Sequence, residues 1–127
     1  MPTFYHSTNH VLKVLDYSKL LASIEGHENG ALGMWASTEL VEWTEGFGVN
    51  TYAISVPDEA KSVGIGISEL MMWAADYKTK DYVKLRQKYL DERVIYLNIV
   101  ESSGKIDMVV LLDFESLTPV LIDSTRK

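Results

Sequence analysis

The chain contains no cysteine, only three prolines and no long apolar run, and each shortage removes a class of protein. Without cysteine there is no disulfide, no thiol nucleophile and no Cys-ligated zinc, which fits a cytoplasmic protein. No segment approaches the roughly 20 apolar residues that span a bilayer, so we expect no membrane partner and no signal peptide. The ordinary globular composition of the 127 residues predicts one small domain, residues 1–127.

Basic residues are scarce, with 12 Lys and Arg against 18 Asp and Glu and a formal net charge of -6. This balance argues against general nucleic-acid binding, because phosphate contacts need clustered Lys and Arg. The one basic cluster lies between Lys78 and Arg93, where it is interleaved with Asp81, Asp91 and Glu92. We interpret it as the solvated face of a helix.

Motifs for metal, nucleotide and serine chemistry are also missing. The three histidines, His6, His10 and His27, form no helical pair of the kind that binds zinc, so no metal site is predicted. There is no P-loop and no Gly-x-Ser-x-Gly elbow. Gly64 and Gly66 make a bare Gly-x-Gly without the third glycine of a dinucleotide fingerprint.

Alternating and apolar segments predict five or six strands. One of them carries Trp35 and ends at Ser37 or Thr38, and the others cover 3–8, 50–56, 94–100, 106–113 and 117–122. Helical spacing predicts helices over 11–24 with a break near Asp16, over about 40–44, over 68–77 and over 81–93. The helix over 68–77 is expected to be largely buried, with Met71, Met72 and Trp73 filling the core. Residues 58–66 are left as a connection. The pattern is that of the α+β class.

The segment from Gly30 to Glu39 is predicted to be a strand that leads into a helix. Gly30 and Gly33 flank an apolar run and permit a tight turn or a close approach by another group. Trp35 follows, and then Ser37 and Thr38 precede an acidic stretch, as at a helix start. An aromatic face, hydroxyl groups and exposed N–H groups suit a ligand, and they equally describe an ordinary strand-to-helix junction.

Three segments carry a possible constellation. His6 lies near the end of the first strand, Trp35 and Ser37 near the end of the second, and Asp113 or Glu115 after the late apolar one. An aromatic plate, a hydrogen-bonding histidine and a carboxylate suit a ligand with a flat amide-bearing ring and a ribose, since the carboxylate stabilises positive charge at the anomeric carbon. Each residue alone also has a structural explanation: a histidine at a sheet edge, a core tryptophan, acids that end a strand.

Four stretches in this order, 4–8, 29–37, 45–48 and 52–56, resemble the ADP-ribosyltransferase superfamily, in particular its compact prokaryotic and phage branch. The resemblance implies an α+β fold with a mixed or antiparallel split sheet and short helices, and NAD as a substrate. The positions that match the family pattern imply NAD contacts from His6, Ser7, Thr8, Gly33, Trp35 and Ser37.

The family's late glutamate corresponds best to Glu115, with Asp113 second and Glu101 a further candidate, so the implied catalytic set is Glu115, Asp113 and His6. The sequence departs from the family pattern at Ser7, where glycine is usual, and at Trp35, where tyrosine is common. A late Gln-x-Glu or Glu-x-Glu pair is also missing, which bears on catalysis more than on fold.

Three functions follow as hypotheses. The first is a mono-ADP-ribosyltransferase, a glycosyl-transferring enzyme that modifies a macromolecular target, expected to be a protein, and that is encoded by a phage or mobile element to act on its host. The second is a non-catalytic binding or inhibitor protein that retains the fold. The third is a hydrolase or nuclease that uses His6 with a carboxylate and requires a divalent metal.

Overall fold

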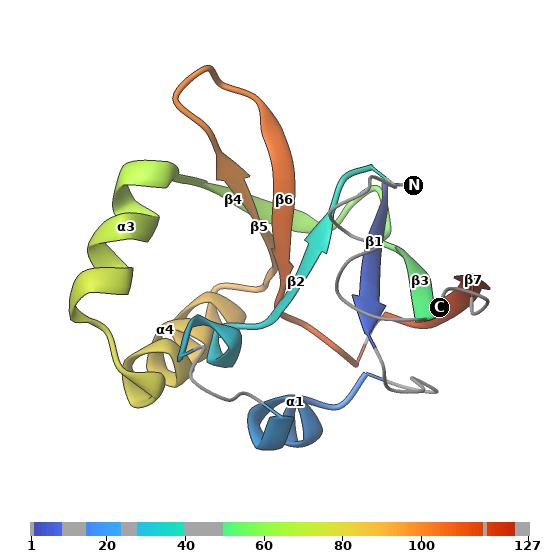
Figure 1. The fold of residues 1–127 in the computed structure, drawn as a ribbon, viewed down its shortest axis with the longest axis horizontal. Helices are drawn as coiled ribbons and strands as arrows, with labels where there is room; N and C mark the ends of the chain where they lie inside the picture. The colour runs from blue at the N-terminus through green and yellow to red at the C-terminus, as the bar shows by residue number, and fades with distance from the viewer. Residues whose placement is uncertain (1, 9–14, 24–27, 40–49, 116, 124–127) are drawn as a thin grey trace.

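The computed structural model describes residues 2–8, 15–23, 28–39, 50–115 and 117–123 (Figure 1). The strands are β1 Thr3–Thr8, β2 Met34–Ser37, β3 Asn50–Ser55, β4 Lys61–Gly66, β5 Val94–Val100, β6 Ile106–Leu111 and β7 Pro119–Asp123. The α-helices are α1 Tyr17–Ser23, α3 Ile67–Asp76 and α4 Thr79–Asp91, and a 3-10 helix, η1, covers Glu28–Ala31. The predicted helix over 40–44 and the first part of the one over 11–24 lie outside the described residues.

The seven strands form one mixed sheet in the order β4-β5-β6-β2-β1-β3-β7. Only β4 and β5 run parallel, joined by the crossover through α3 and α4, and the other neighbours are antiparallel. The predicted α+β class is therefore confirmed. The apolar strand β6 has strands on both sides, as its two-sided apolar pattern predicted.

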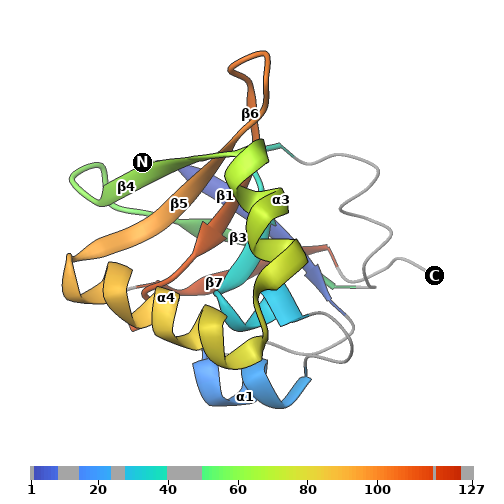
Figure 2. The same cartoon turned by 90° about the vertical axis from the view of Figure 1, so that its left-hand side faces the viewer.

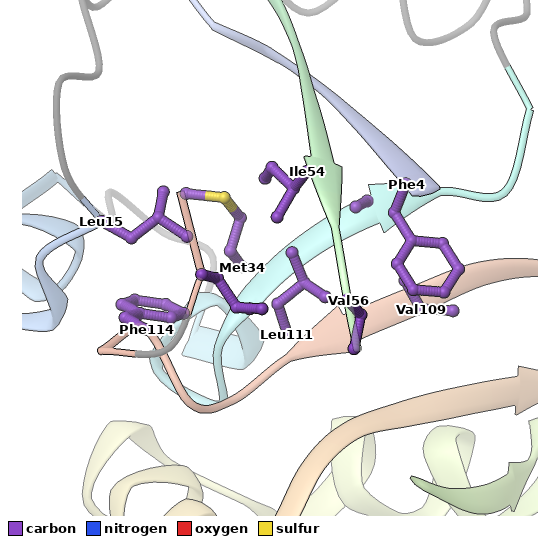
Figure 3. Packing of buried hydrophobic residues seen from close by; sticks show 10 residues of the cluster. Phe4, Leu15, Met34, Ile54, Val56, Val109, Leu111 and Phe114 are labelled. Atoms are coloured by element: carbon purple, nitrogen blue, oxygen red, sulfur yellow. The ribbon is translucent and has the colours of Figure 1, made fainter. Parts of the chain in front are cut away.

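The sheet curls strongly around a core on one of its faces. The rings of Phe4 in β1 and Tyr96 in β5 have centroids 5.1 Å apart, although β2 and β6 separate these strands in the sheet. Leu15, Phe114 and Leu117 join the same core from the segments that close its lower end, and Figure 3 shows the first two beside Met34. A flat sheet could not bring side chains of β1 and β5 together, so the twist of the strands curves the sheet around this core.

The opposite face of the sheet packs against helices α3 and α4 (Figures 1 and 2). Trp73 of α3 and Tyr82 of α4 are the buried residues of these helices, and they pack with Leu97 and Val110 of the sheet. The amphipathic helix predicted over 81–93 is confirmed, beginning slightly earlier. Its first turn is capped by Asp81, whose carboxylate accepts a hydrogen bond from the Lys78 amide at 2.8 Å.

The structure adds one element to the middle of the chain and corrects another. The connection over 58–66, whose form the sequence left open, contains the edge strand β4, where two glycines and exposed polar residues hide the strand pattern. The helix over 68–77 exists, but it is not largely buried, because Met71 and Met72 are each 67% exposed and only Trp73 is buried. The helix lies on one face of the sheet, so residues on its outer side have no core to enter.

Among the described ranges, no helix is long and apolar enough to cross a membrane.

Candidate functional site

Here, an edge of the sheet means the boundary formed by strand ends, as distinct from the edge strands β4 and β7. The candidate site lies at the edge where β1 ends and β2 begins. Because β1 is antiparallel to β2 and β2 is antiparallel to β6, the ends of β1 and β6 lie at the same edge (Figure 1). The pairing of Met34 with Leu111 places the start of β2 beside the end of β6. The segments that carry His6, Trp35 and Asp113 therefore approach one edge of the sheet.

His6 links β1 to β2 through its side chain. Its Nδ1 lies 2.7 Å from the main-chain oxygen of Trp35. A carbonyl oxygen only accepts hydrogen bonds, so Nδ1 carries the proton and Nε2 of the neutral ring has a free lone pair. The two strands register at a single pair, Tyr5 with Ser37, whereas β1 and β3 register at six positions. The imidazole thus supplements the short pairing between β1 and β2.

Burial keeps this imidazole neutral. Desolvation lowers the pKa of His6 below its ordinary value of 6.5, and the hydrogen bond to the Trp35 carbonyl raises it only in part. At neutral pH the ring is therefore a donor at Nδ1 and an acceptor at Nε2.

The lowered pKa of His6 predicts that acid destabilises the fold. The unfolded state takes up a proton near pH 6.5, while the folded state does so only at lower pH. The stabilisation is therefore complete above that pH and is lost as the pH falls from about 7 toward the folded-state pKa. Urea unfolding between pH 8 and 5.5 should show the wild-type protein losing stability relative to His6→Gln, a comparison in which the other two histidines are unchanged. A constant difference across this range would contradict the assignment.

The indole of Trp35 is on the other face of the sheet from the His6 imidazole. Strand alternation puts His6 on the face of Phe4, which belongs to the curled core, and Trp35 packs with Val110 on the helix-covered face. The Trp35 Nε1 donates to the Asn29 carbonyl of η1 at 3.1 Å, which holds the ring in place. The structure therefore joins His6 to the main chain of Trp35 and not to its indole.

The predicted hydroxyl contacts are engaged within the fold. The buried Ser7 hydroxyl lies 2.8 Å from the Thr51 hydroxyl of β3. The Ser37 hydroxyl donates to the Glu39 carbonyl at 2.5 Å and accepts from the Glu39 amide at 3.2 Å. Thr8 is half-buried at the end of β1. Thr8 is the last residue of β1, and His6 lies two residues before it.

Gly33 meets another strand. A Cβ at this position would lie 2.3 Å from the Leu111 main-chain oxygen and 2.9 Å from a Val110 methyl group. The close approach that the sequence predicted at this glycine is thus made by β6, which leaves the packing of two strands as its structural role.

The candidate acids follow β6, where the chain still pairs with β5. The Asp113 amide donates to the Ile95 carbonyl at 3.3 Å, and the Asp113 carboxylate accepts from the Glu115 amide at 3.1 Å. Asp113 is half-buried and Glu115 is exposed. Glu101, the third candidate, lies in the turn between β5 and β6, at the opposite edge of the sheet.

Arg86 is the residue that sequence reasoning missed. Its guanidinium lies over the Tyr17 ring, with Cζ 3.6 Å from the ring centroid, and Nη2 donates to the Leu112 carbonyl at 3.0 Å. Burial lowers the pKa of Arg86, while Tyr17 and Asp113 raise it, so Asp113 belongs to the electrostatic surroundings of this arginine. The available signal was the position of Arg86 one helical turn after Tyr82, on the side of α4 that faces inward.

No group of three His, Asp or Glu side chains suited to a metal occurs in the part of the chain that the structure describes, which excludes His10 and His27. The chain matches no protein-family model, no curated protein and no solved structure.

Proposed function

We propose that the chain binds NAD at the edge of the sheet where β1 ends and β2 begins, and that it transfers ADP-ribose to a protein target. The observation that carries the proposal is the state of His6, a neutral ring fixed by the Trp35 carbonyl with its Nε2 available as an acceptor. Such a nitrogen suits a ribose hydroxyl, which can donate to it. The single residue pair between β1 and β2 fits the split sheet of an ADP-ribosyltransferase-like fold.

In this reaction the bond between nicotinamide and the ribose C1′ breaks, and nicotinamide leaves with the bonding electrons. The anomeric carbon becomes positively charged in the transition state, and a nearby carboxylate stabilises it. A nucleophilic side chain of the target then bonds to C1′ and releases its proton. Glu115 is exposed just beyond β6 and is our first candidate for the carboxylate, with Asp113 second.

A binding protein without catalysis is the second candidate function. It is favoured by the hydrogen bonds of Ser7 and Ser37, which are made within the fold, and by the position of Asp113 beside Arg86. In that case the sheet edge would contact a partner and NAD would not bind.

The decisive experiment is an NAD titration followed by tryptophan fluorescence, together with an assay of nicotinamide release. Wild-type protein should bind NAD, and His6→Gln should weaken binding by about tenfold or more because the acceptor nitrogen is lost. Glu115→Gln should bind NAD normally but release nicotinamide about 100-fold more slowly. Glu101→Gln, which removes an exposed carboxylate at the other edge, is the matched control and should behave as wild type.

Two results would decide against the transferase. Absence of NAD binding at millimolar concentration would leave the binding protein as the better proposal. Binding without nicotinamide release, in both the presence and the absence of candidate protein acceptors, would point to NAD recognition without chemistry.

A further inference from the structure

Helix α4 carries three lysines in line on its outer side, Lys80, Lys84 and Lys88, which we call the lysine row. Their spacing of four residues places neighbours about 6 Å apart along the helix and gives the row a length of about 12 Å. All three side chains are exposed. The inward side of the helix, with Tyr82 and Leu85, packs in the core between the helices and the sheet.

The fold does not neutralise the lysine row. Asp81 accepts from the Lys78 amide at the helix start, and Asp91 accepts from the Gln87 side chain at 2.8 Å. The row has no salt bridge with any residue in the described part of the chain, where the ion pair that occurs joins Lys105 to Asp107.

The rest of the chain has the opposite charge. Residues 78–93 contain half of the 12 basic residues, in a chain with 18 acidic ones and a net charge of -6. A long nucleic acid or an anionic membrane would extend past the 12 Å row and meet the acidic remainder, which would repel it. A short acidic segment, with carboxylates at helical spacing, complements the row without reaching beyond it.

We propose that the lysine row docks a short acidic segment of a protein partner. The contact is electrostatic and exposed, so it contributes to orientation and association rate more than to affinity, and it weakens with salt. This inference goes beyond the proposed function and stands whether or not the chain uses NAD, because the row lies on the solvent side of α4 and includes none of the NAD-site residues.

The test uses fluorescence anisotropy at low ionic strength with a labelled alanine-based peptide that carries Glu at positions i, i+4 and i+8. The peptide should bind the wild-type protein, and its Gln counterpart should not. Reversal of the row, Lys80→Glu with Lys84→Glu and Lys88→Glu, should weaken binding by about tenfold or more. The matched control reverses three lysines outside α4 and its flanking residues, Lys19, Lys105 and Lys127, with the same change in net charge, and should bind within about threefold of wild type.

Circular dichroism tests whether both triple variants are folded. If the reversed row variant does not fold, a variant with Lys80, Lys84 and Lys88 changed to Gln replaces it. Equal losses in the row variant and the control would overturn the proposal, because net charge alone would then explain binding. It would also be overturned if the acidic peptide failed to bind at millimolar concentration, or if a 20-nucleotide oligothymidylate or phosphatidylserine vesicles bound more tightly than the peptide.

Discussion

The Gly33→Ala variant is expected to lose about 3 kcal/mol of unfolding free energy or to fail to fold, although it adds only one methyl group. The added carbon would lie 2.3 Å from the Leu111 main-chain oxygen, inside any allowed contact. That oxygen belongs to β6, which pairs with β2 and β5 on either side and cannot shift alone. Urea unfolding followed by circular dichroism measures the loss.

Gly66→Ala is the matched control, since a Cβ there meets nothing within 4 Å. The backbone at Gly66 has φ -69° and ψ 151°, which alanine adopts without strain. The variant should be neutral or more stable by about 0.5 kcal/mol, because alanine reduces the entropy of the unfolded chain. Similar losses for both glycine variants would show that backbone entropy, and not the contact with Leu111, governs the effect.

Gly33 illustrates which features of the fold could be predicted from the sequence and which could not. It identified Gly33 as a point of close approach from its place before Trp35, but the group that approaches comes from a strand about 80 residues later in the chain. Strands such as 3–8 and 94–100 were predicted correctly because their aromatic and β-branched residues lie together in one short segment. The edge strand β4 was not, because it is defined by its parallel pairing with β5 beyond two helices.

Only part of the candidate site was predictable from the sequence, because the site also depends on how distant strands pair. The sequence predicted His6, Trp35 and Asp113 each at the end of a strand, but Trp35 lies at the start of β2. The three segments share an edge because β1 is antiparallel to β2 and β2 to β6, a pairing that the sequence did not predict. The face of each side chain depends on register, and the pair Tyr5 with Ser37 puts His6 and Trp35 on opposite faces. No local pattern encodes that register, so the expected pocket lined by both rings could not be checked from the sequence.

Arg86→Ala is expected to destabilise the fold by about 2–3 kcal/mol, since the guanidinium joins three separate parts of the chain. It lies over Tyr17 of α1, extends from α4 and donates to the Leu112 carbonyl after β6. A charged hydrogen bond contributes about 1.5–3 kcal/mol and a cation–π contact about 0.5–2 kcal/mol. Within the part of the chain that the structure describes, the buried Nε has no hydrogen-bond partner, and removing that unfavourable burial offsets part of the loss.

A double-mutant cycle separates the stacking from the hydrogen bond. Tyr17→Leu removes the ring, so its effect should couple to Arg86→Ala by about 1 kcal/mol, measured by urea unfolding. Tyr17→Phe retains the ring and loses only the hydroxyl that donates to the Ala31 carbonyl, so it should couple weakly. Strong coupling with Tyr17→Phe would assign the interaction to the phenol and not to the ring. Because Arg86 also holds the main chain next to Asp113, the same variants should change nicotinamide release if that segment supplies the carboxylate, and leave NAD affinity at His6 unchanged.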